Sequence, residues 1–394
     1  MGKNNYIRVA TTLYKKVRKP LQSGDFIDVR IPWNYETLRQ DESKDFISTI
    51  EKYDGFCCVP SHTNYKPVIG TFLNDYESIN IEAQEGEFSK IKIFLRHIFG
   101  EQYELGLDYL QLLYTQPIER LPILLLVSKE RNTGKTTFLN LLKSIFGANM
   151  TFNTNEDFRS QFNSDWATKL IVAVDEVLLD RREDSERIKN LSTARNYKAE
   201  AKGKDRNEVE FFAKFILCSN NESKPIYIES GEIRYWVRKV GTIKADNPNL
   251  LEEMRKEIPA LLYYLLHRQL STAKESRMWF KKSLIKTDAL TKIITSNRGR
   301  AESEILHTLD EIMEVMKVDS IEFCVEDLSA ILDAKGMQID HHRIRHIIKN
   351  SWSLEAEKPR RYISYRIMID GTIEQNKRLG RCYTLTRQKL NEFL

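Results

Sequence analysis

The segment Arg131-Asn132-Thr133-Gly134-Lys135-Thr136-Thr137 lies between two stretches of different character. Residues 121–127 before it form a short apolar run, LPILLLV, which is typical of a strand buried on both faces. Residues 137–146 after it have the apolar spacing of a helix, which Gly147 is placed to end. A loop between a buried strand and a helix presents free backbone N–H groups where anions bind. The sequence therefore predicts a phosphate-binding loop here.

The residue types in this loop suit a nucleoside triphosphate. Gly134 lets the backbone approach the phosphates, Lys135 can reach the β- and γ-phosphates, and the Thr136 hydroxyl can bind Mg²⁺. One position departs from the pattern G-x-x-x-x-G-K-[ST], because Lys129 stands where the first glycine is expected. A Gly-Lys-Thr tripeptide alone is common, so the prediction depends on the segments further along the chain. The predicted nucleotide-binding residues are Asn132, Thr133, Gly134, Lys135, Thr136 and Thr137.

Two carboxylates, Asp175 and Glu176, follow the next apolar run, residues 170–174. Because the carboxyl ends of parallel strands meet at one edge of a sheet, Asp175 is expected beside the phosphate loop, sharing Mg²⁺ with Thr136. The adjacent Glu176 can orient the attacking water. Two acids at a strand end are otherwise ordinary solvated residues. Their position after a phosphate loop favours a catalytic site for ATP and Mg²⁺.

Later segments add three candidates for catalysis beside Glu176. An apolar run at 211–218 leads to Asn220, whose amide can hydrogen-bond the γ-phosphate or the water; an ordinary asparagine turn is the alternative. Arg234 and Arg238 lie in a short aromatic stretch near a fourth predicted strand, 237–243. An arginine here can stabilise charge on the γ-phosphate of a neighbouring subunit, and a surface ion pair is the alternative. The predicted catalytic residues are Glu176, Asn220, Arg234 and Arg238.

Strands separated by helical patterns predict an α/β fold with a parallel sheet covered on both faces. Helical patterns at 250–270 and 273–294 follow the last strand, and a linker is expected around 296–301. Three further helices, at 302–316, 325–332 and 341–352, precede two strands, at 362–369 and 381–385, which are expected to pair as a β-hairpin, in the order of a winged helix. The predicted divisions are an accessory region of uncertain fold at 1–85, two helices within 86–120, a core at 121–295 and a winged-helix domain at 296–394.

Four segments together resemble the superfamily 3 helicases, and more narrowly the primase-helicases of phages, plasmids and mobile elements, which have an AAA+-type P-loop core. They are residues 131–137, 171–176, 215–220 and 233–238, and residues 88–113 resemble the helical collar before that core. The resemblance implies a homo-oligomeric ring, usually a hexamer, that moves along single-stranded DNA while it hydrolyses ATP. It implies roles at the matching positions: Lys135 and Thr136 as Walker A, Asp175 and Glu176 as Walker B, Asn220 as sensor, and Arg234 or else Arg238 as arginine finger.

A basic segment, 196–207, lies between the strand that carries the acids and the strand before Asn220. In the resembled family this interval holds a hairpin that projects into the pore of the ring, where lysines can follow DNA phosphates. A solvated surface hairpin is the alternative. The predicted DNA-binding residues of this segment are Lys198, Lys202, Lys204 and Arg206.

The C-terminal domain divides by charge. Residues 302–340 carry eleven acids against two lysines, whereas residues 341–394 carry twelve lysines and arginines against five acids. The basic half includes the third helix and the strands, which touch DNA in helix-turn-helix relatives, although winged helices also dock proteins. The predicted DNA contacts in this half are Arg343, Arg345, Lys349, Arg360 and Arg361.

Composition excludes several classes of protein. With 41% hydrophobic and 30% charged residues, the 394-residue chain is globular and neither disordered nor fibrous. It has no apolar run of about 18 residues, so no membrane partner is expected. Its five cysteines are scattered without a C-x-x-C pair, which favours a reducing cytoplasm, that of a bacterial host if a phage or plasmid encodes the chain.

These features predict an ATP-dependent DNA helicase that acts on single-stranded or forked DNA in the replication of a phage, plasmid or other mobile element. The first 85 residues lack a D-x-D pair for polymerase metals, so a primase or initiator is expected as a separate chain. Two alternatives stay open. One is an AAA+ ATPase that loads, remodels or packages DNA without unwinding it; the other is a non-catalytic winged-helix DNA-binding protein with a degenerate ATPase core.

Overall fold

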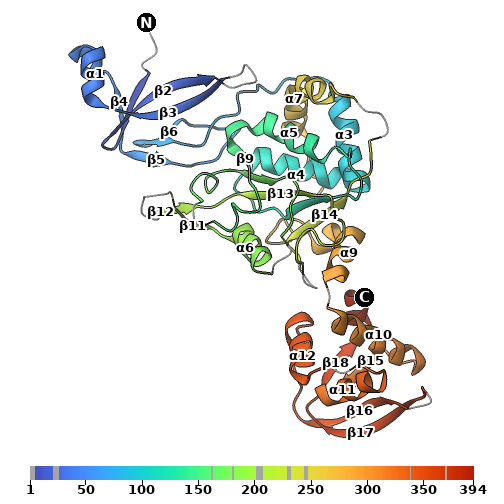
Figure 1. Ribbon diagram of the computed structural model, residues 1–394. Coiled ribbons are helices and arrows are strands. Elements are labelled where there is room, and N and C mark those ends of the chain that lie inside the picture. The colour runs from blue at the N-terminus through green and yellow to red at the C-terminus, as the bar shows by residue number, and fades with distance from the viewer. Residues whose placement is uncertain are drawn as a thin grey trace.

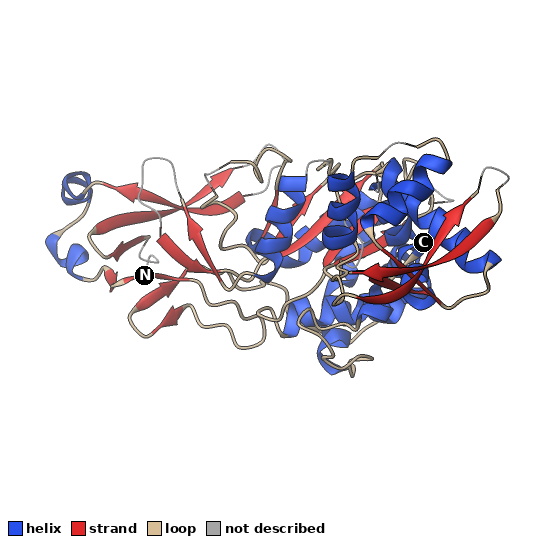
Figure 2. Ribbon diagram, turned by 90° about the horizontal axis from the view of Figure 1, so that it is seen from below, coloured by secondary structure: helices blue, strands red, loops and turns tan. Residues whose placement is uncertain are grey.

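The computed structural model describes residues 5–20, 26–160, 163–179, 182–200, 207–228, 232–243, 247–297, 299–337, 339–368 and 371–394. Figure 1 shows a strand-rich N-terminal region, a central α/β core and a smaller C-terminal unit along the chain. In the view of Figure 2 the N-terminal strands again lie at one end, and helices gather around the core. No helix within these ranges is both long and apolar enough to cross a lipid bilayer.

The core is built on a parallel sheet, which confirms the predicted α/β fold. Within the described ranges its strand order is β14-β8-β13-β10-β9, and every neighbouring pair runs parallel. The strands are β8 (Ile123–Val127), β9 (Met150–Phe152), β10 (Ile171–Val174), β13 (Lys214–Ser219) and β14 (Tyr235–Lys239). The predicted fourth strand began too late, at 237. The sequence prediction missed β9, because three residues carry no readable periodicity.

Helices cover both faces of this sheet (Figure 1). One face packs against α3 (Ser89–Phe99), α4 (Tyr103–Thr115), α5 (Lys135–Phe146) and α7 (Leu250–His267). The other packs against α6 (Arg182–Thr193) and α9 (Asp288–Asn297). Neighbouring strand residues alternate between the two cores, as in β14, where Trp236 joins the first and Val237 the second. The helices predicted within 86–120 are α3 and α4, separated by the short 3-10 helix η1 (Gly100–Gln102).

The continuous helical pattern predicted at 273–294 is wrong. The chain leaves α7 in a long loop and forms only α8 (Lys282–Ile285) before α9. The buried carboxylate of Asp108 holds the start of this loop, since it accepts hydrogen bonds from Arg268 at 2.7 Å, from the Ser271 backbone at 3.0 Å and from the Thr272 backbone at 2.8 Å. These tertiary hydrogen bonds occupy backbone N–H groups that a helix would use. They join residues far apart in the chain, so the local sequence pattern does not predict them.

Residues 5–20 and 26–85, the described part of the N-terminal region, contain two small sheets. One has the order β3-β2-β1-β4, with helices α1 (Tyr35–Asp41) and α2 (Lys44–Ser48) between β3 and β4; the other has the order β5-β7-β6. The strands are β1 (Tyr6–Val9), β2 (Thr12–Pro20), β3 (Phe26–Trp33), β4 (Glu51–Tyr53), β5 (Gly55–Cys57), β6 (Val68–Ile69) and β7 (Phe72–Asn74). Strands of two to nine residues with prolines explain why this region has little readable periodicity.

His62 joins the N-terminal region to the core. Its Nδ1 donates to the carbonyl of Tyr114 at 2.7 Å, and its Nε2 accepts from the Tyr76 hydroxyl at 2.6 Å, an assignment that requires the neutral ring. Burial lowers the pKa of His62 from 6.5 to about 4.

The structure therefore becomes less stable as the pH falls from about 6.5 to 4. Over this window His62 is protonated in the unfolded chain but stays neutral in the folded chain. The free energy of unfolding therefore decreases with falling pH. We expect the wild type to lose on the order of 1 kcal/mol per pH unit more than the variant His62→Phe. Urea unfolding at about pH 7.5 and about pH 5 measures this difference, and parallel losses in both proteins would contradict it.

The C-terminal unit has its own hydrophobic core, drawn from residues 301–393. It contains α10 (Arg300–Val315), β15 (Ser320–Phe323), α11 (Val325–Ala334), α12 (His341–His346), the π-helical turn η3 (Ile347–Ser351), β16 (Arg360–Ile367), β17 (Ile373–Gly380), β18 (Tyr383–Thr386) and α13 (Arg387–Phe393). The predicted helices are therefore present, and the linker shrinks to the few residues between α9 and α10.

The predicted pairing of strands 362–369 and 381–385 is wrong. The partner of β16 is β17, and β18 pairs with β15. The strand β17 is polar and largely exposed, so its sequence IEQNKRLG gives no hydrophobic alternation to read. Leu385 of β18 is fully buried. An apolar residue at this position indicates a strand but does not indicate which strand pairs with it.

Candidate functional site

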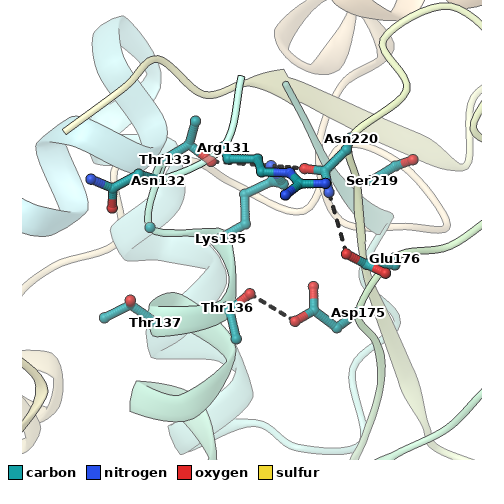
Figure 3. A pocket seen from close by; sticks show the side chains of 11 residues that line it. Arg131, Asn132, Thr133, Lys135, Thr136, Thr137, Asp175, Glu176, Ser219 and Asn220 are labelled. Carbon is teal, nitrogen blue, oxygen red and sulfur yellow. Dashed lines mark hydrogen bonds between the residues drawn. The ribbon is translucent and has the colours of Figure 1, made fainter. Parts of the chain in front are cut away.

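A cavity of about 430 Å³ opens at the carboxyl edge of the parallel sheet (Figure 3). Its walls come from the loop between β8 and α5 and from the residues directly after β10 and β13. The lining residues are Arg131, Asn132, Thr133, Gly134, Lys135, Thr136, Thr137, Asp175, Glu176, Ser219 and Asn220. The structure therefore brings together all six predicted nucleotide-binding residues with Asp175, Glu176 and Asn220.

The loop backbone takes a shape that glycine makes possible. Gly134 has φ of 83°, in the left-handed region, directly before α5 begins at Lys135. A Cβ at Gly134 would also meet the Phe94 ring at 2.9 Å. From the same helix α3, His97 Nε2 lies 3.0 Å from the carbonyl of Thr133. The helix α3 thus supports the loop from behind and leaves the N-terminus of α5 facing the cavity, as an anion site requires.

Lys135 is a buried ammonium surrounded by neutral oxygens. Its Nζ donates to the Ser128 hydroxyl, to the Thr133 hydroxyl at 3.1 Å and to the Asn220 side-chain carbonyl at 3.0 Å. Burial lowers the pKa of Lys135, and the charges of Asp175 and Glu176 act in the opposite direction. A desolvated cation without a directly bonded carboxylate is well suited to gain a phosphate as its partner.

The oxygen atoms in the cavity fit a magnesium ion. The Thr136 hydroxyl donates to Asp175 Oδ2 at 2.7 Å, so one hydroxyl and one carboxylate already converge. Among the described residues no group of three or more His, Cys, Asp or Glu side chains could hold a metal by itself. Magnesium is commonly held by one or two protein oxygens together with substrate phosphates and water, and these two side chains fit that arrangement.

Asn220 connects the two charged sides of the cavity. Its side-chain oxygen accepts from Lys135, and its Nδ2 lies 3.4 Å from Glu176 Oε1. Glu176 has φ of 62°, a left-handed backbone that side chains other than glycine rarely adopt. Such strained residues concentrate at functional sites. The exposed Glu176 carboxylate is therefore aimed by the turn after β10 and by Asn220, within reach of a water in the cavity.

Three residues near the loop have contacts at the site, although the sequence analysis assigned them no role. Ser128, at the end of β8, holds Lys135, and Arg131 lines the cavity. Glu222 accepts from the backbone N–H of Lys129 at 3.0 Å and forms ion pairs with Lys239 at 3.1 Å and Lys292 at 2.8 Å. Residue 129 thus has a structural anchor although it is not glycine. Only Ser128 and Arg131, as neighbours of the motif, had a signal in the sequence.

The two arginine candidates lie outside this cavity. Arg234 precedes β14, at the opposite, amino edge of the sheet, and its guanidinium lies 3.1 Å from Glu232. Arg238 is buried on the face of α3 and α4, where it donates to Glu101 at 2.6 Å and Gln102 at 2.9 Å. Arg238 therefore connects the core to the turn between those helices, and its hydrogen bond lowers the pKa of Glu101.

Replacing Arg238 should weaken the fold more than it changes chemistry. The variant Arg238→Ala removes charge-assisted hydrogen bonds at a buried site, so we expect the free energy of unfolding to fall by about 2 kcal/mol. The exposed Arg255, replaced by alanine as a control, should cost less than about 0.5 kcal/mol. Urea denaturation measures both. Unchanged stability together with lost ATP turnover in Arg238→Ala would instead indicate an arginine finger.

The basic hairpin is present in part. Strands β11 (Asn196–Ala199) and β12 (Asn207–Glu210) pair antiparallel, and Lys198 is exposed opposite Glu208. Lys202, Lys204 and Arg206 lie outside the described residues. The hairpin base is held by Asn163, which donates to the Tyr197 hydroxyl at 2.9 Å.

The five predicted DNA contacts of the C-terminal unit fall into two groups. Arg343 and Arg345 are exposed on α12, Lys349 on η3 and Arg361 on β16. Arg360 instead forms ion pairs with Glu322 at 2.7 Å and Glu357 at 2.8 Å, and the hydrogen bonds to these two carboxylates raise its pKa. Arg360 is thus engaged within the unit, whereas the other four remain available to a ligand.

The segment that holds the cavity matches a known family. Residues 126–234 match a protein family described as a family of unknown function (DUF5906). Over 176 residues, or 43% of the chain, the sequence is 30% identical to the DNA primase-polymerase of Nitratiruptor phage NrS-1 and is homologous to it. The match covers 24% of the phage protein, so the chain spans about a quarter of the length of this relative.

Solved structures of the NrS-1 C-terminal region share the fold of nearly the whole chain. One apo structure has a TM-score of 0.61 at 17% identity, covering 90% of this chain and 91% of that one. A second, the A form of the apo region, has a TM-score of 0.62 at 16% identity, covering 96% and 95%. The N-terminal sheets, the core and the C-terminal unit therefore resemble one contiguous region of the phage protein.

Proposed function

We propose that the chain is an ATP-hydrolysing motor with an AAA+-type P-loop core, acting as a DNA helicase in phage replication. One observation carries the proposal: Lys135, Thr136, Asp175, Glu176 and Asn220, from three separate segments, line one cavity at the carboxyl edge of a parallel sheet. Ligands of such sheets bind at this edge, where neighbouring strands lead to separate loops. The interior position of β8, between β13 and β14, supports a phosphate site in the loop after it.

The proposed chemistry assigns one task to each side chain. The triphosphate lies against the N-terminus of α5, and Lys135 exchanges its neutral oxygen partners for phosphate oxygens. Thr136 and Asp175 would hold Mg²⁺, which would supply positive charge against the phosphate oxygens. Glu176 orients the attacking water and receives its proton, while Asn220 fixes the carboxylate and the γ-phosphate relative to each other.

The role proposed for Arg234 requires that subunits contact one another in a ring. This residue lies at the edge of the sheet away from its own cavity, so an arginine finger at this position would have to act on the cavity of a neighbouring subunit. Head-to-tail contacts of this kind close into rings. We propose a homo-oligomer, hexameric by resemblance, with the C-terminal unit acting as a winged-helix DNA-binding domain through Arg343, Arg345, Lys349 and Arg361.

The relative gives the proposed setting. A homologue named as a phage DNA primase-polymerase favours a role in phage DNA replication, in the cytoplasm of the bacterial host. The homologous segment here carries the cavity, so we assign it to the motor step and leave priming to another chain or segment. The retained set of Lys135, Thr136, Asp175, Glu176 and Asn220 argues against a degenerate core.

Strand displacement tests the proposal. The wild-type protein, with Mg²⁺ and ATP, should separate a forked DNA duplex, and the variant Lys135→Ala should not. Equal displacement by both proteins would refute the helicase. Turnover of ATP that DNA stimulates without any displacement would instead identify a loading, remodelling or packaging ATPase. Absence of Mg²⁺-dependent ATP turnover with every DNA tested would favour the third reading, a non-catalytic DNA-binding protein.

A further inference from the structure

A second cavity, lined by both apolar and charged side chains, lies at the amino edge of the core sheet, away from the phosphate loop. Its volume is about 590 Å³. It is lined by the segment before β8, the C-terminal end of α6, the base of the hairpin β11–β12, the start of β13 and the loop after α7, with Val59 and Pro60 of the N-terminal region at one side. Its charged lining residues are Glu119, Arg120, Arg195, Glu210, Lys214, Lys274 and Arg277.

Three arginines line this cavity, Arg120 half-buried and Arg195 and Arg277 exposed, together with the exposed carboxylate of Glu210. In the described part of the chain, Arg120, Arg195 and Arg277 make no ion pair. The nearby Glu119 carboxylate is occupied by Lys274 at 2.6 Å. Burial, and after it repulsion from Arg195 and Arg277, lowers the pKa of Arg120. Like charges held this close are unfavourable by themselves, and an anion between them would relieve the repulsion.

The segments that carry two of these arginines are fixed in place. Lys214, fully buried at the start of β13, donates to the carbonyl of Pro117 and, at 2.7 Å, to that of Phe212, which ties the segment before Arg120 to the sheet. The carbonyl of Arg195 accepts from the Phe211 backbone at 2.7 Å, which closes the base of the hairpin. The charges are therefore presented by a preformed wall, so binding requires little ordering of the backbone.

We propose that this cavity binds backbone phosphates of a single-stranded polynucleotide that passes the base of the hairpin β11–β12. Planar guanidinium groups suit phosphodiester oxygens, and several of them side by side suit successive phosphates. No helix begins in the described segments that line the cavity, so it lacks the helix N-terminus that favours a terminal triphosphate. The inference deepens the proposed function and rests on it for the identity of the strand.

The test uses the full chain and a fluorescent oligothymidylate of about 20 nucleotides, without ATP. The double variant Arg120→Gln/Arg277→Gln removes two charges from the cavity. Its matched control, Arg39→Gln/Arg255→Gln, removes two exposed arginines that pair elsewhere, with Glu36 and Glu252. We expect the cavity variant to bind the oligonucleotide at least about tenfold more weakly than the control, and its logarithmic salt dependence to be shallower by about 1.4.

Further measurements separate the outcomes. Binding of a fluorescent ATP analogue and the thermal unfolding midpoint report whether the cavity variant is folded, and Arg120→Lys/Arg277→Lys, which keeps the charge, should recover much of the DNA affinity. Equal oligonucleotide affinity in cavity and control variants would overturn the proposal. Loss of ATP-analogue binding with unchanged DNA affinity would identify a free nucleotide as the ligand and also overturn it. Lys135→Ala tests the other cavity: its failure to bind ATP, with normal DNA binding, leaves this inference intact.

Discussion

Replacing Lys135 by alanine should lower ATP turnover by at least about a hundredfold. The ammonium of this lysine is the buried cation of the candidate site, and its present partners, Ser128, Thr133 and Asn220, are all neutral. A triphosphate would therefore give Lys135 its first negatively charged hydrogen-bond partner, so the variant loses both ground-state binding and stabilisation of charge on the γ-phosphate. Release of inorganic phosphate at saturating Mg²⁺ and ATP measures the effect.

The chain offers a matched control for this variant. Lys129 is an exposed lysine of the same loop, and among the described residues its contact is the hydrogen bond from its backbone N–H to Glu222. Lys129→Ala makes the same change of side chain and charge, and we expect it to keep most of the turnover. Because burial already lowers the pKa of Lys135, the alanine variant should unfold at a temperature close to that of the wild type. Normal turnover in folded Lys135→Ala would remove the basis of the proposed function.

The substitution Glu176→Gln should separate nucleotide binding from hydrolysis. Glutamine keeps the size of the side chain and its hydrogen-bonding reach to Asn220 but cannot accept a proton, so turnover should fall by about 10² to 10⁴. The affinity for ATP should stay within about threefold, since Lys135, Thr136 and Asp175 remain. Equilibrium binding of a labelled ATP analogue and single-turnover hydrolysis measure the two quantities. Equal losses of binding and turnover would place Glu176 in binding rather than in catalysis.

A mixing experiment extends this prediction to Arg234. Arg234→Ala subunits should bind ATP without hydrolysing it, because the neighbouring cavity lacks its arginine. Mixed with Glu176→Gln subunits, they should regain part of their turnover, since one of the two kinds of mixed contact joins an intact cavity to an intact arginine. Failure of every mixing ratio would indicate that Arg234 serves only its contact with Glu232.

Local signals predicted the candidate site because its residues come directly after buried strands. The runs before Asn132, Asp175 and Asn220 are apolar on both faces, and parallel strands bring the residues at their carboxyl ends to one edge of the sheet. The fold of residues 1–85 was not predictable in this way, since short strands lack periodicity. Glu222 was also hidden, because its contacts with Lys129, Lys239 and Lys292 join residues far apart in sequence. The cluster of Arg120, Arg195 and Arg277 was hidden for the same reason, because its members are also far apart in sequence.

The ion pairs of Glu222 give the nucleotide loop a mechanical connection to the rest of the chain. Lys292 belongs to α9, and α10 of the C-terminal unit begins at Arg300, shortly after α9 ends at Asn297. A displacement of the backbone at Lys129 that keeps its hydrogen bond to Glu222 and the ion pair of Glu222 with Lys292 would move α9 with it. If hydrolysis of a nucleotide displaced this loop, the displacement would reach α9 and, through it, the start of the C-terminal unit.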